Sequence, residues 1–162
     1  MAKIEAHGSS VQNIVEGCGV FQNRVKALLA EKGISDIDPG KWYDLEVVLA
    51  VTEELAKSVG PNVLVEIGKY APKNAQFPPE INSFEKALLS LDIAYKMNHR
   101  NGNIGEYKVQ QEDLKTFKVI CDTPYPSKFN LGLLRGLARK FNSLVRIEEE
   151  GSARGGAFTV RV

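Results

Sequence analysis

The sequence is poor in the residues that form metal centres and disulfide frameworks. Its 162 residues include two cysteines, Cys18 and Cys121, and two histidines, His7 and His99. None of these four stands at a ligand spacing such as that of two cysteines separated by two residues. Cysteines so far apart in the sequence are typical of reduced thiols in a cytoplasmic protein. We therefore predict a cytoplasmic location and no metal site.

The chain also lacks a dominant charge and a long apolar run. Its 21 basic and 20 acidic residues leave a net charge of +1, so no field that attracts nucleic acid is expected. No stretch approaches the roughly 20 apolar residues that span a bilayer. The first ten residues, MAKIEAHGSS, have no apolar core of the kind found in secretory leaders. We expect no nucleic-acid partner, no membrane span and no leader.

Catalytic motifs are missing as well. The sequence shows no phosphate-binding loop, no dinucleotide-binding glycine motif and no pattern of a nucleophile with its base. Cys121 falls on the core side of an alternating segment, where a free cysteine usually serves as a small apolar residue. We predict no catalytic residue, and an enzyme is the less favoured class of protein.

Apolar residues recur with helical spacing through the first two-thirds of the chain. After a polar lead-in over residues 1–19, this spacing predicts a mainly helical region over residues 20–101. Glycine and proline mark the ends of the helices, for example at Gly33 and at Gly60-Pro61. The last of these helices carries Phe84, Leu88, Leu91 and Tyr95 on one face.

The last third of the chain changes to alternation of apolar and polar residues. The alternation predicts four strands within residues 106–162, with a helix over residues 130–141 between the second and the third. Helices followed by an antiparallel meander indicate an α+β fold. With 43% hydrophobic residues the chain suffices for one domain, residues 1–162, in which the N-terminal helical layer packs on the sheet.

Two glycine motifs have more than one interpretation. Gly132 and Gly136 share one face of the predicted helix 130–141, so a ligand or another backbone could approach closely there. Tight packing of that helix on the sheet is the interpretation that we favour, because glycine otherwise destabilises a helix. Arg154-Gly155-Gly156 could form a nest of amides for an anion, but a hairpin loop is the simpler explanation.

A helical layer over an antiparallel sheet can enclose an apolar cavity with a few polar groups at its mouth. Most aromatic residues fall on faces predicted to be buried, where packing is their default role. His99 follows Tyr95 by one turn on the same predicted helix face, so the two could act together. We predict that the following residues contact a ligand in such a cavity: Trp42, Tyr43, Ile67, Tyr70, Phe84, Leu88, Tyr95, His99 and Phe117.

Two segments carry a family resemblance. The run DTPYPSKFNLGLLRGLARKF, followed by GSARGGAFTVRV, resembles the C-terminal half of 4-vinyl reductase-like domains, which have a Pro-Tyr-Pro turn, a helix with two glycines and a Gly-Gly hairpin. The stretch from Trp42 to Lys69 is similar to their N-terminal half. That family shares its fold with heme–nitric-oxide sensor domains and with transport-particle subunits that hold an acyl chain. The resemblance implies a small-molecule-binding domain, often the sensory part of a regulator of aromatic hydrocarbons, and does not imply reductase activity.

The resemblance also bears on cofactors. Some members hold zinc with cysteines near the turn and the hairpin, where this chain has Ser127 and Ser152. A zinc site of the family type is therefore not expected. A heme would need a proximal histidine, which would have to be His99. Because no second motif supports that role, heme is not expected either.

These observations together predict a sensor-like domain that binds an apolar or aromatic small molecule between its helices and its sheet. We further expect the protein to form a homodimer. Two alternatives stay open. The chain could be a structural dimer subunit whose cavity is filled by side chains, or an accessory protein of tetrapyrrole vinyl reduction.

Overall fold

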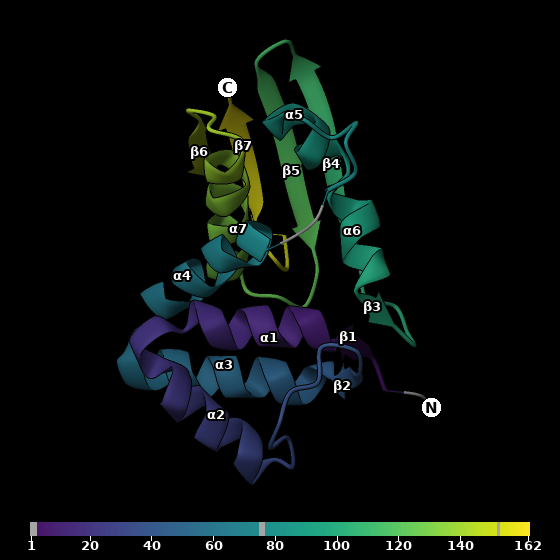
Figure 1. The fold of residues 1–162 in the computed structure, drawn as a ribbon. Coiled ribbons are helices and arrows are strands. Elements are labelled where there is room, and N and C mark those ends of the chain that lie inside the picture. The colour runs from purple at the N-terminus through teal and green to yellow at the C-terminus, as the bar shows by residue number, and fades with distance from the viewer. Residues whose placement is uncertain (1–2, 75–76, 152) are drawn as a thin grey trace.

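The structure is a computed structural model that describes residues 3–74, 77–151 and 153–162. It confirms the predicted α+β fold, with a helical lobe at the N-terminus and a lobe built on an antiparallel sheet (Figure 1). The α-helices are α1 (Gly8–Gly17), α2 (Gln22–Glu31), α3 (Leu45–Val59), α4 (Asn62–Tyr70), α5 (Phe84–Leu89), α6 (Leu91–Met97) and α7 (Ser127–Lys140). Two short 3₁₀ helices are η1 (Gly19–Phe21) and η2 (Ala71–Asn74).

The described strands form two antiparallel sheets. The smaller sheet has the order β2-β1-β3, and the larger has the order β4-β5-β7-β6. The smaller one contains β1 (Glu5–His7), β2 (Trp42–Asp44) and β3 (His99–Arg100). The larger one contains β4 (Glu106–Asp113), β5 (Thr116–Asp122), β6 (Arg146–Glu149) and β7 (Ala157–Arg161). The four strands predicted from alternation are therefore confirmed, whereas strands of two or three residues are too short to show it.

The structure differs from our expectation for residues 1–19, which form β1 and α1 rather than a polar lead-in. Val11, Ile14 and Val15 are buried on one face of α1. His7 caps this helix, because its Nδ1 accepts a hydrogen bond from the backbone N–H of Ser9. These three apolar residues lie among polar ones, so their helical spacing gives only a weak signal in the sequence.

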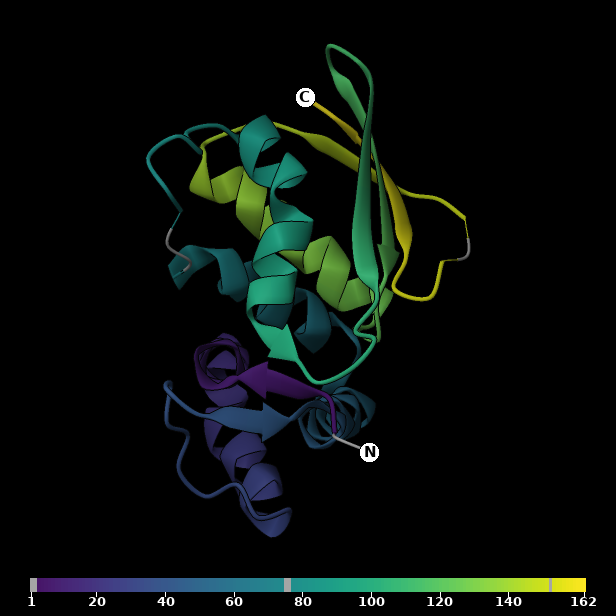
Figure 2. The same cartoon turned by 90° about the vertical axis from the view of Figure 1, so that its right-hand side faces the viewer.

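The region after residue 82 also differs from the single long helix that the apolar stripe predicts. The helix is interrupted at Ser90, which separates α5 from α6. Helix α6 ends at Met97, so His99 lies in β3 rather than on the helix. Pairing of β3 with β1 joins this segment to the start of the chain, at the base of the sheet lobe (Figure 2).

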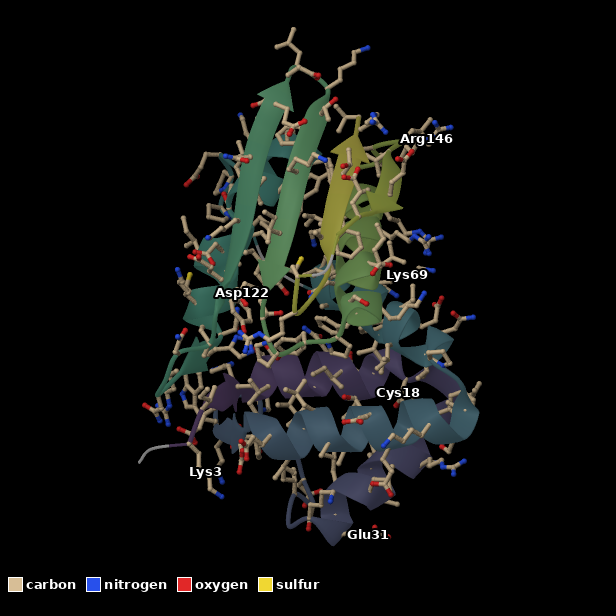
Figure 3. All side chains as sticks on the ribbon, turned by 180° about the vertical axis from the view of Figure 1, so that it is seen from behind. Lys3, Cys18, Glu31, Lys69, Asp122 and Arg146 are labelled. Carbon is tan, nitrogen blue, oxygen red and sulfur yellow. The ribbon has the colours of Figure 1, made fainter. Side chains whose placement is uncertain are left out.

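Helices cover one face of the larger sheet, and the other face is open to solvent (Figure 2). Phe117, Val119 and Phe158 point from the strands into the core, where Leu134 and Leu137 of α7 are also buried. Ion pairs that include Lys118–Glu150 and Arg161–Glu148 join the strands. Figure 3 shows the opposite face of the sheet, which none of the described helices covers. The alternation of apolar and polar residues along the strands therefore places one face of the sheet on the core and the other in solvent, as is typical of antiparallel sheets.

Helices α4 and α7 approach each other at glycines. A Cβ at Gly132 would overlap the carbonyl oxygen of Val65, and one at Gly136 would overlap that of Lys69. On the other side, a Cβ at Gly68 would overlap the carbonyl oxygen of Phe129. The favoured interpretation, packing of this face on the sheet, is therefore wrong, and the alternative of a close approach by another backbone, that of helix α4, is confirmed. This contact places α7 at the junction of the two lobes.

Candidate functional site

The junction of the two lobes holds a buried aromatic group that we call the His99 cluster: Tyr95, His99, Tyr107, Tyr125 and Phe129. Helix α6 supplies Tyr95, β3 supplies His99, and the turn before α7 supplies Tyr125. His99 is 8% exposed and Tyr125 is 5% exposed. The histidine Nε2 lies 2.7 Å from the Tyr125 hydroxyl, although 26 positions separate the two residues.

Two hydrogen bonds fix the tautomer of His99. Its Nδ1 lies 2.8 Å from the backbone carbonyl oxygen of Tyr95, which can only accept, so Nδ1 carries the proton. Nε2 therefore has a free lone pair and accepts from the Tyr125 hydroxyl. Burial lowers the pKa of His99, and this outweighs the opposing effect of the hydrogen bond to Tyr95. A neutral imidazole with Nδ1–H bonded to a carbonyl is the form that metal-ligating histidines take.

The rest of the cluster packs around this histidine. The rings of Tyr95 and His99 are 4.5 Å apart, and Tyr95 meets Tyr107 edge-on at 5.0 Å. Tyr125 stacks on Phe129 at 4.7 Å, with an angle of 25° between the ring planes. Burial raises the pKa of the Tyr95, Tyr107 and Tyr125 hydroxyls, so all three are neutral donors at neutral pH.

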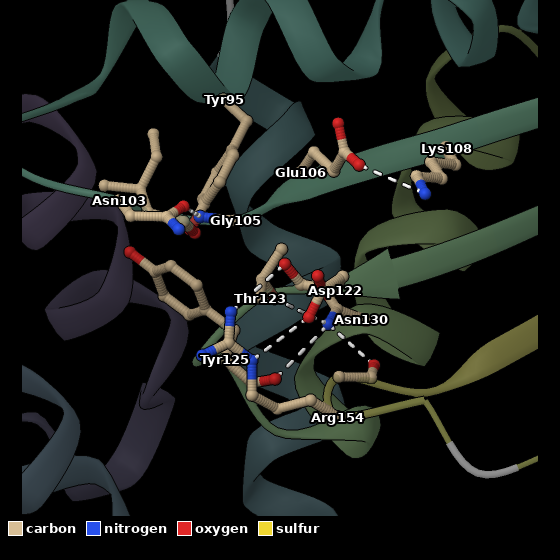
Figure 4. A network of polar contacts seen from close by, with 12 residues as sticks. Tyr95, Asn103, Gly105, Glu106, Lys108, Asp122, Thr123, Tyr125, Asn130 and Arg154 are labelled. Carbon is tan, nitrogen blue, oxygen red and sulfur yellow. Dashed lines mark hydrogen bonds and ion pairs between the residues drawn. The ribbon is translucent and has the colours of Figure 1, made fainter.

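A polar network holds the turn of Tyr125 against the last hairpin (Figure 4). The Nδ2 of the fully buried Asn130 donates to the carbonyl oxygen of Gly155 at 2.8 Å and more weakly to that of Tyr125 at 3.4 Å. Arg154 forms an ion pair with Asp122 at 3.4 Å on the surface above. The network ties the β6–β7 loop to the first turn of α7.

The segment Arg154-Gly155-Gly156 is the hairpin loop that we favoured from the sequence. The N–H of Gly155 donates to the carbonyl oxygen of Cys121 at 2.8 Å. The N–H of Gly156 donates to that of Ala153 at 3.0 Å. These two amides are therefore already satisfied, which argues against an anion nest here.

The space beside Tyr125 is nearly filled. A closed cavity of about 10 Å³ lies between the helical lobe and the first turn of α7, with room for one water. Pockets for drug-sized ligands measure about 300–1,000 Å³. The described residues beside Tyr125 therefore leave no room for such a ligand, and the predicted hydrophobic pocket is not confirmed. The closed cavity is lined by Ile14, Leu49, Thr52, Leu64, Ile67, Tyr125, Pro126 and Phe129.

A second hollow, which we call the side groove, opens to solvent beside the closed cavity. Its volume is about 670 Å³. Helix α3, the start of α4 and the proline turn before α7 form its walls. It is lined by Leu49, Glu53, Ala56, Lys57, Gly60, Pro61, Leu64, Pro124 and Pro126.

The structure brings three of the predicted site residues to this junction. Tyr95 and His99 lie in contact, as the sequence predicts, and Ile67 lines the closed cavity. Phe84, Leu88, and Phe117 of β5 are fully buried core residues. Neither hollow is lined by any of those three.

The remaining predicted residues lie elsewhere. Trp42 packs in the small sheet, with the guanidinium group of Arg100 4.4 Å from its ring centre. The Tyr43 hydroxyl accepts from the backbone N–H of Asp38 at 2.7 Å. Tyr70 is half-buried at the end of α4. These three residues were predicted to be buried, and the small sheet and the helix ends do cover part of each side chain.

Sequence reasoning missed four residues of the site, namely Tyr107, Tyr125, Phe129 and Asn130. The last three belong to the conspicuous run DTPYPSKFN, which predicts a turn and a helix start. An aromatic residue between two prolines was a signal that this turn presents a side chain. No local pattern, however, showed that it would meet His99.

Comparisons with known proteins show the fold. The structure is similar to the oxygen complex of an oxygen-binding H-NOX domain related to soluble guanylate cyclases, with a TM-score of 0.71 and 16% identity over 95% of this chain and 91% of that one. It is also similar to a mutant structure of the T. tengcongensis H-NOX, with a TM-score of 0.67 and 18% identity over 95% of this chain and 94% of the other. A structure from a study of heme distortion in the H-NOX family has a TM-score of 0.67 and 16% identity over 95% of this chain and 90% of its own.

The protein thus has the fold of H-NOX domains. Neither a protein-family model nor a curated protein matches the sequence. The fold group shared with heme–nitric-oxide sensors is confirmed, and the 4-vinyl reductase-like family itself finds no support. Our expectation that heme is not a cofactor is corrected, because solved structures of this fold come from studies of heme. The zinc expectation stays a prediction, in which Ser127 begins α7 and Ser152 lies outside the described residues.

The residues at the junction meet part of what a heme needs. His99 offers a neutral Nε2 in the tautomer required of an axial ligand. Room is lacking, because the Tyr125 hydroxyl lies against Nε2 and the closed cavity is about 10 Å³. Among the described residues, no buried side-chain nitrogen or oxygen lacks a partner. A ligand at His99 must therefore displace Tyr125 rather than enter a vacant site.

Proposed function

We propose that this chain is a small-molecule-binding domain of the sensor type, with His99 as the group that contacts the ligand and heme as that ligand. The observation that supports it is the tautomer of His99, whose Nε2 lone pair is held at the lobe junction by the Tyr95 carbonyl. None of the other described histidines or cysteines has this arrangement: His7 caps α1, and both cysteines are buried free thiols. The fold of heme-binding domains supports the choice of ligand.

The cluster supplies a flat apolar surface as well as a ligand atom. Tyr125 and Phe129 are stacked on each other, and Tyr125 meets His99 edge-on. Turning Tyr125 away breaks one neutral hydrogen bond and one aromatic contact, each worth about 1 kcal/mol, and exposes a ring that is buried in the structure. Burial of a large apolar ring, at about 25 cal/mol per Å², has to offset all three losses. A heme held by His99 would supply an iron that can bind a diatomic gas.

A hemin titration followed by absorbance tests the proposal. We expect one equivalent to bind, and His99→Ala to weaken binding at least about tenfold, because even loss of an outer partner of a metal ligand costs that much. Tyr125→Phe should bind at least as tightly, since Nε2 no longer has to be freed. His7→Ala is the matched control, because it removes the other histidine. Equal affinities of His7→Ala and His99→Ala would contradict the proposal.

The chain has a second candidate function as a structural dimer subunit with a filled cavity. The small volume of the closed cavity favours it. Leu89 at the end of α5 and Ile93 and Met97 of α6 are exposed apolar side chains, with exposures of 52%, 64% and 73%. Asp92 and Lys96, which form an ion pair with each other at 2.7 Å, lie beside these residues on α6.

Sedimentation analysis separates the two functions. A homodimer that Ile93→Glu dissociates, in a protein that binds no hemin, favours the structural subunit. A protein that binds hemin through His99, whether monomer or dimer, favours the sensor-type domain. The homodimer and the cytoplasmic location both remain proposals. None of the described helices is long and apolar enough to cross a membrane.

A further inference from the structure

Strand β6 stands at one edge of the larger sheet, where Arg146 is labelled in Figure 3. It pairs with β7 on one side, and no strand among the described residues pairs with its other side. Just after the strand, the N–H of Glu150 donates to the carbonyl oxygen of Ala157 at 2.6 Å. Because N–H groups alternate sides along an antiparallel strand, those of Ile147 and Glu149 point away from β7. This free side of β6 therefore presents backbone donors and acceptors to a further strand.

The charged side chains of β6 are of both signs. Arg146 is exposed and lies directly opposite Arg161 of β7, and like charges in this position destabilise a strand pair. Arg161 forms an ion pair with Glu148 at 3.3 Å, whereas Arg146 has no ion pair within the described part of the chain. Arg146 and Glu148 are two positions apart and so project from the same face of the sheet. The edge strand thus carries one cation that lacks a counter-ion.

The same strand of a second copy complements this edge. When two β6 strands pair antiparallel about a twofold axis at Ile147, Arg146 of each copy lies opposite Glu148 of the other. The half-buried Ile147 then meets its own equivalent, and its outward N–H faces the carbonyl oxygen of that residue. An axis at Arg146 or at Glu148 would instead place like charges opposite each other. Charges on an edge strand usually discourage pairing, but these favour one register.

We propose that two copies of this chain associate through the free side of β6, so that their larger sheets form one continuous sheet. We call this contact the β6 interface. It consists of backbone hydrogen bonds around Ile147 and of two Arg146–Glu148 pairs on the exposed face. The inference rests on the homodimer proposed above, for which it names the interface, and it involves no property of His99.

Charge reversals test the register. Arg146→Glu places two glutamates opposite each other at both pairs, and Glu148→Arg places two arginines there. Each variant should weaken the dimer at least about tenfold in sedimentation analysis, because like charges across an interface are strongly unfavourable. Glu112→Arg is the matched control, since Glu112 is exposed on β4 at the other edge of the same sheet. It should leave the dimer unchanged.

Mixing the two variants tests the pairing itself. Equal amounts of Arg146→Glu and Glu148→Arg proteins, each shown to be folded by circular dichroism, should form a heterodimer. Every glutamate at the seam then meets an arginine, and native mass spectrometry distinguishes the heterodimer by its mass. The double variant Arg146→Glu/Glu148→Arg reverses both pairs and should dimerise as the wild type does. A dimer of Arg146→Glu as stable as that of the wild type, or no heterodimer between folded variants, would overturn the β6 interface.

Two further outcomes separate this inference from the proposed homodimer. Dissociation by Ile93→Glu, with the β6 variants still dimeric, would overturn the β6 interface and leave the homodimer intact. A wild-type protein that is monomeric would overturn both. Hemin binding is measured separately, so none of these results decides whether His99 holds a ligand.

Discussion

The Tyr107 hydroxyl of strand β4 donates a 2.6 Å hydrogen bond to the side-chain oxygen of Asn130 in helix α7. Asn130 passes the connection on, because its Nδ2 donates to the carbonyl oxygen of Gly155 in the last hairpin. Three segments far apart in the sequence thus meet at one buried amide. This arrangement fixes the turn that carries Tyr125.

Substitution of Asn130 should therefore destabilise the whole junction. Asn130→Ala removes the acceptor of the Tyr107 hydroxyl and the side-chain donor to the Gly155 carbonyl, and each loss costs about 1–3 kcal/mol. Tyr107→Phe removes the donor but leaves Asn130 its other contacts, so it should cost about 1 kcal/mol. Urea unfolding followed by circular dichroism measures both free energies. Equal, small losses in the two variants would contradict the role of Asn130.

Helix α7 should tolerate no side chain at Gly132. Gly132→Ala places a methyl group on the backbone of Val65, and overpacking of this kind typically costs about 1–3 kcal/mol, or more where backbone must move. Arg135→Ala, on the exposed side of the same helix, is the control and should change stability by less than about 0.5 kcal/mol. Thermal unfolding of the two variants checks the difference. An unchanged midpoint for Gly132→Ala would show that α4 and α7 lie further apart than described.

Stability should fall in mild acid because of His99. Burial lowers the pKa of His99 below the ordinary value of 6.5, so the unfolded chain binds a proton that the folded chain resists. The contribution is fully present above pH 6.5 and is lost as the pH falls from 6.5 towards the lowered value. Urea unfolding of the wild type and His99→Gln at about pH 7.5, 6.5 and 5.5 measures this. The same decline in both proteins would assign it to other groups.

Both cysteines should be inert in the folded protein. Burial raises the pKa of Cys18 and of Cys121 to about 12, and the thiolate is the form that reacts. Alkylation by iodoacetamide at about pH 8, counted by mass spectrometry, should therefore modify neither thiol until the protein is unfolded in urea. Rapid modification of Cys121 in the native protein would mean that the sheet opens beside the His99 cluster.

Local patterns in the sequence predicted much of the architecture. Alternation over residues 106–162 is a direct consequence of one buried sheet face, and it located the four strands of the larger sheet. The small sheet escaped prediction because β3 has two residues and pairs with β1, which lies at the other end of the helical region. The packing of Gly132 on helix α4 was not predicted for a similar reason. The four-residue spacing of the glycines shows that one helix face has no side chains, but it does not show which element packs there.

The site was predicted only where its members are close in the sequence. Tyr95 and His99 were paired by helical spacing, and they do meet, although the helix ends between them and β3 turns the histidine back. Tyr125 was missed because its contact with His99 spans 26 positions. Whether side chains fill the cavity was left open from the sequence, since side-chain volume at the junction depends on how closely two lobes approach.

Chemical rescue is the most direct test of the central claim, that His99 Nε2 is the ligand atom. The substitution His99→Gly removes the imidazole, and free imidazole can then diffuse to the same place. Hemin should bind to the wild type without additive, and to His99→Gly only when imidazole is added, with matching absorbance spectra. Binding to His99→Gly without imidazole, or no rescue by imidazole, would contradict the account.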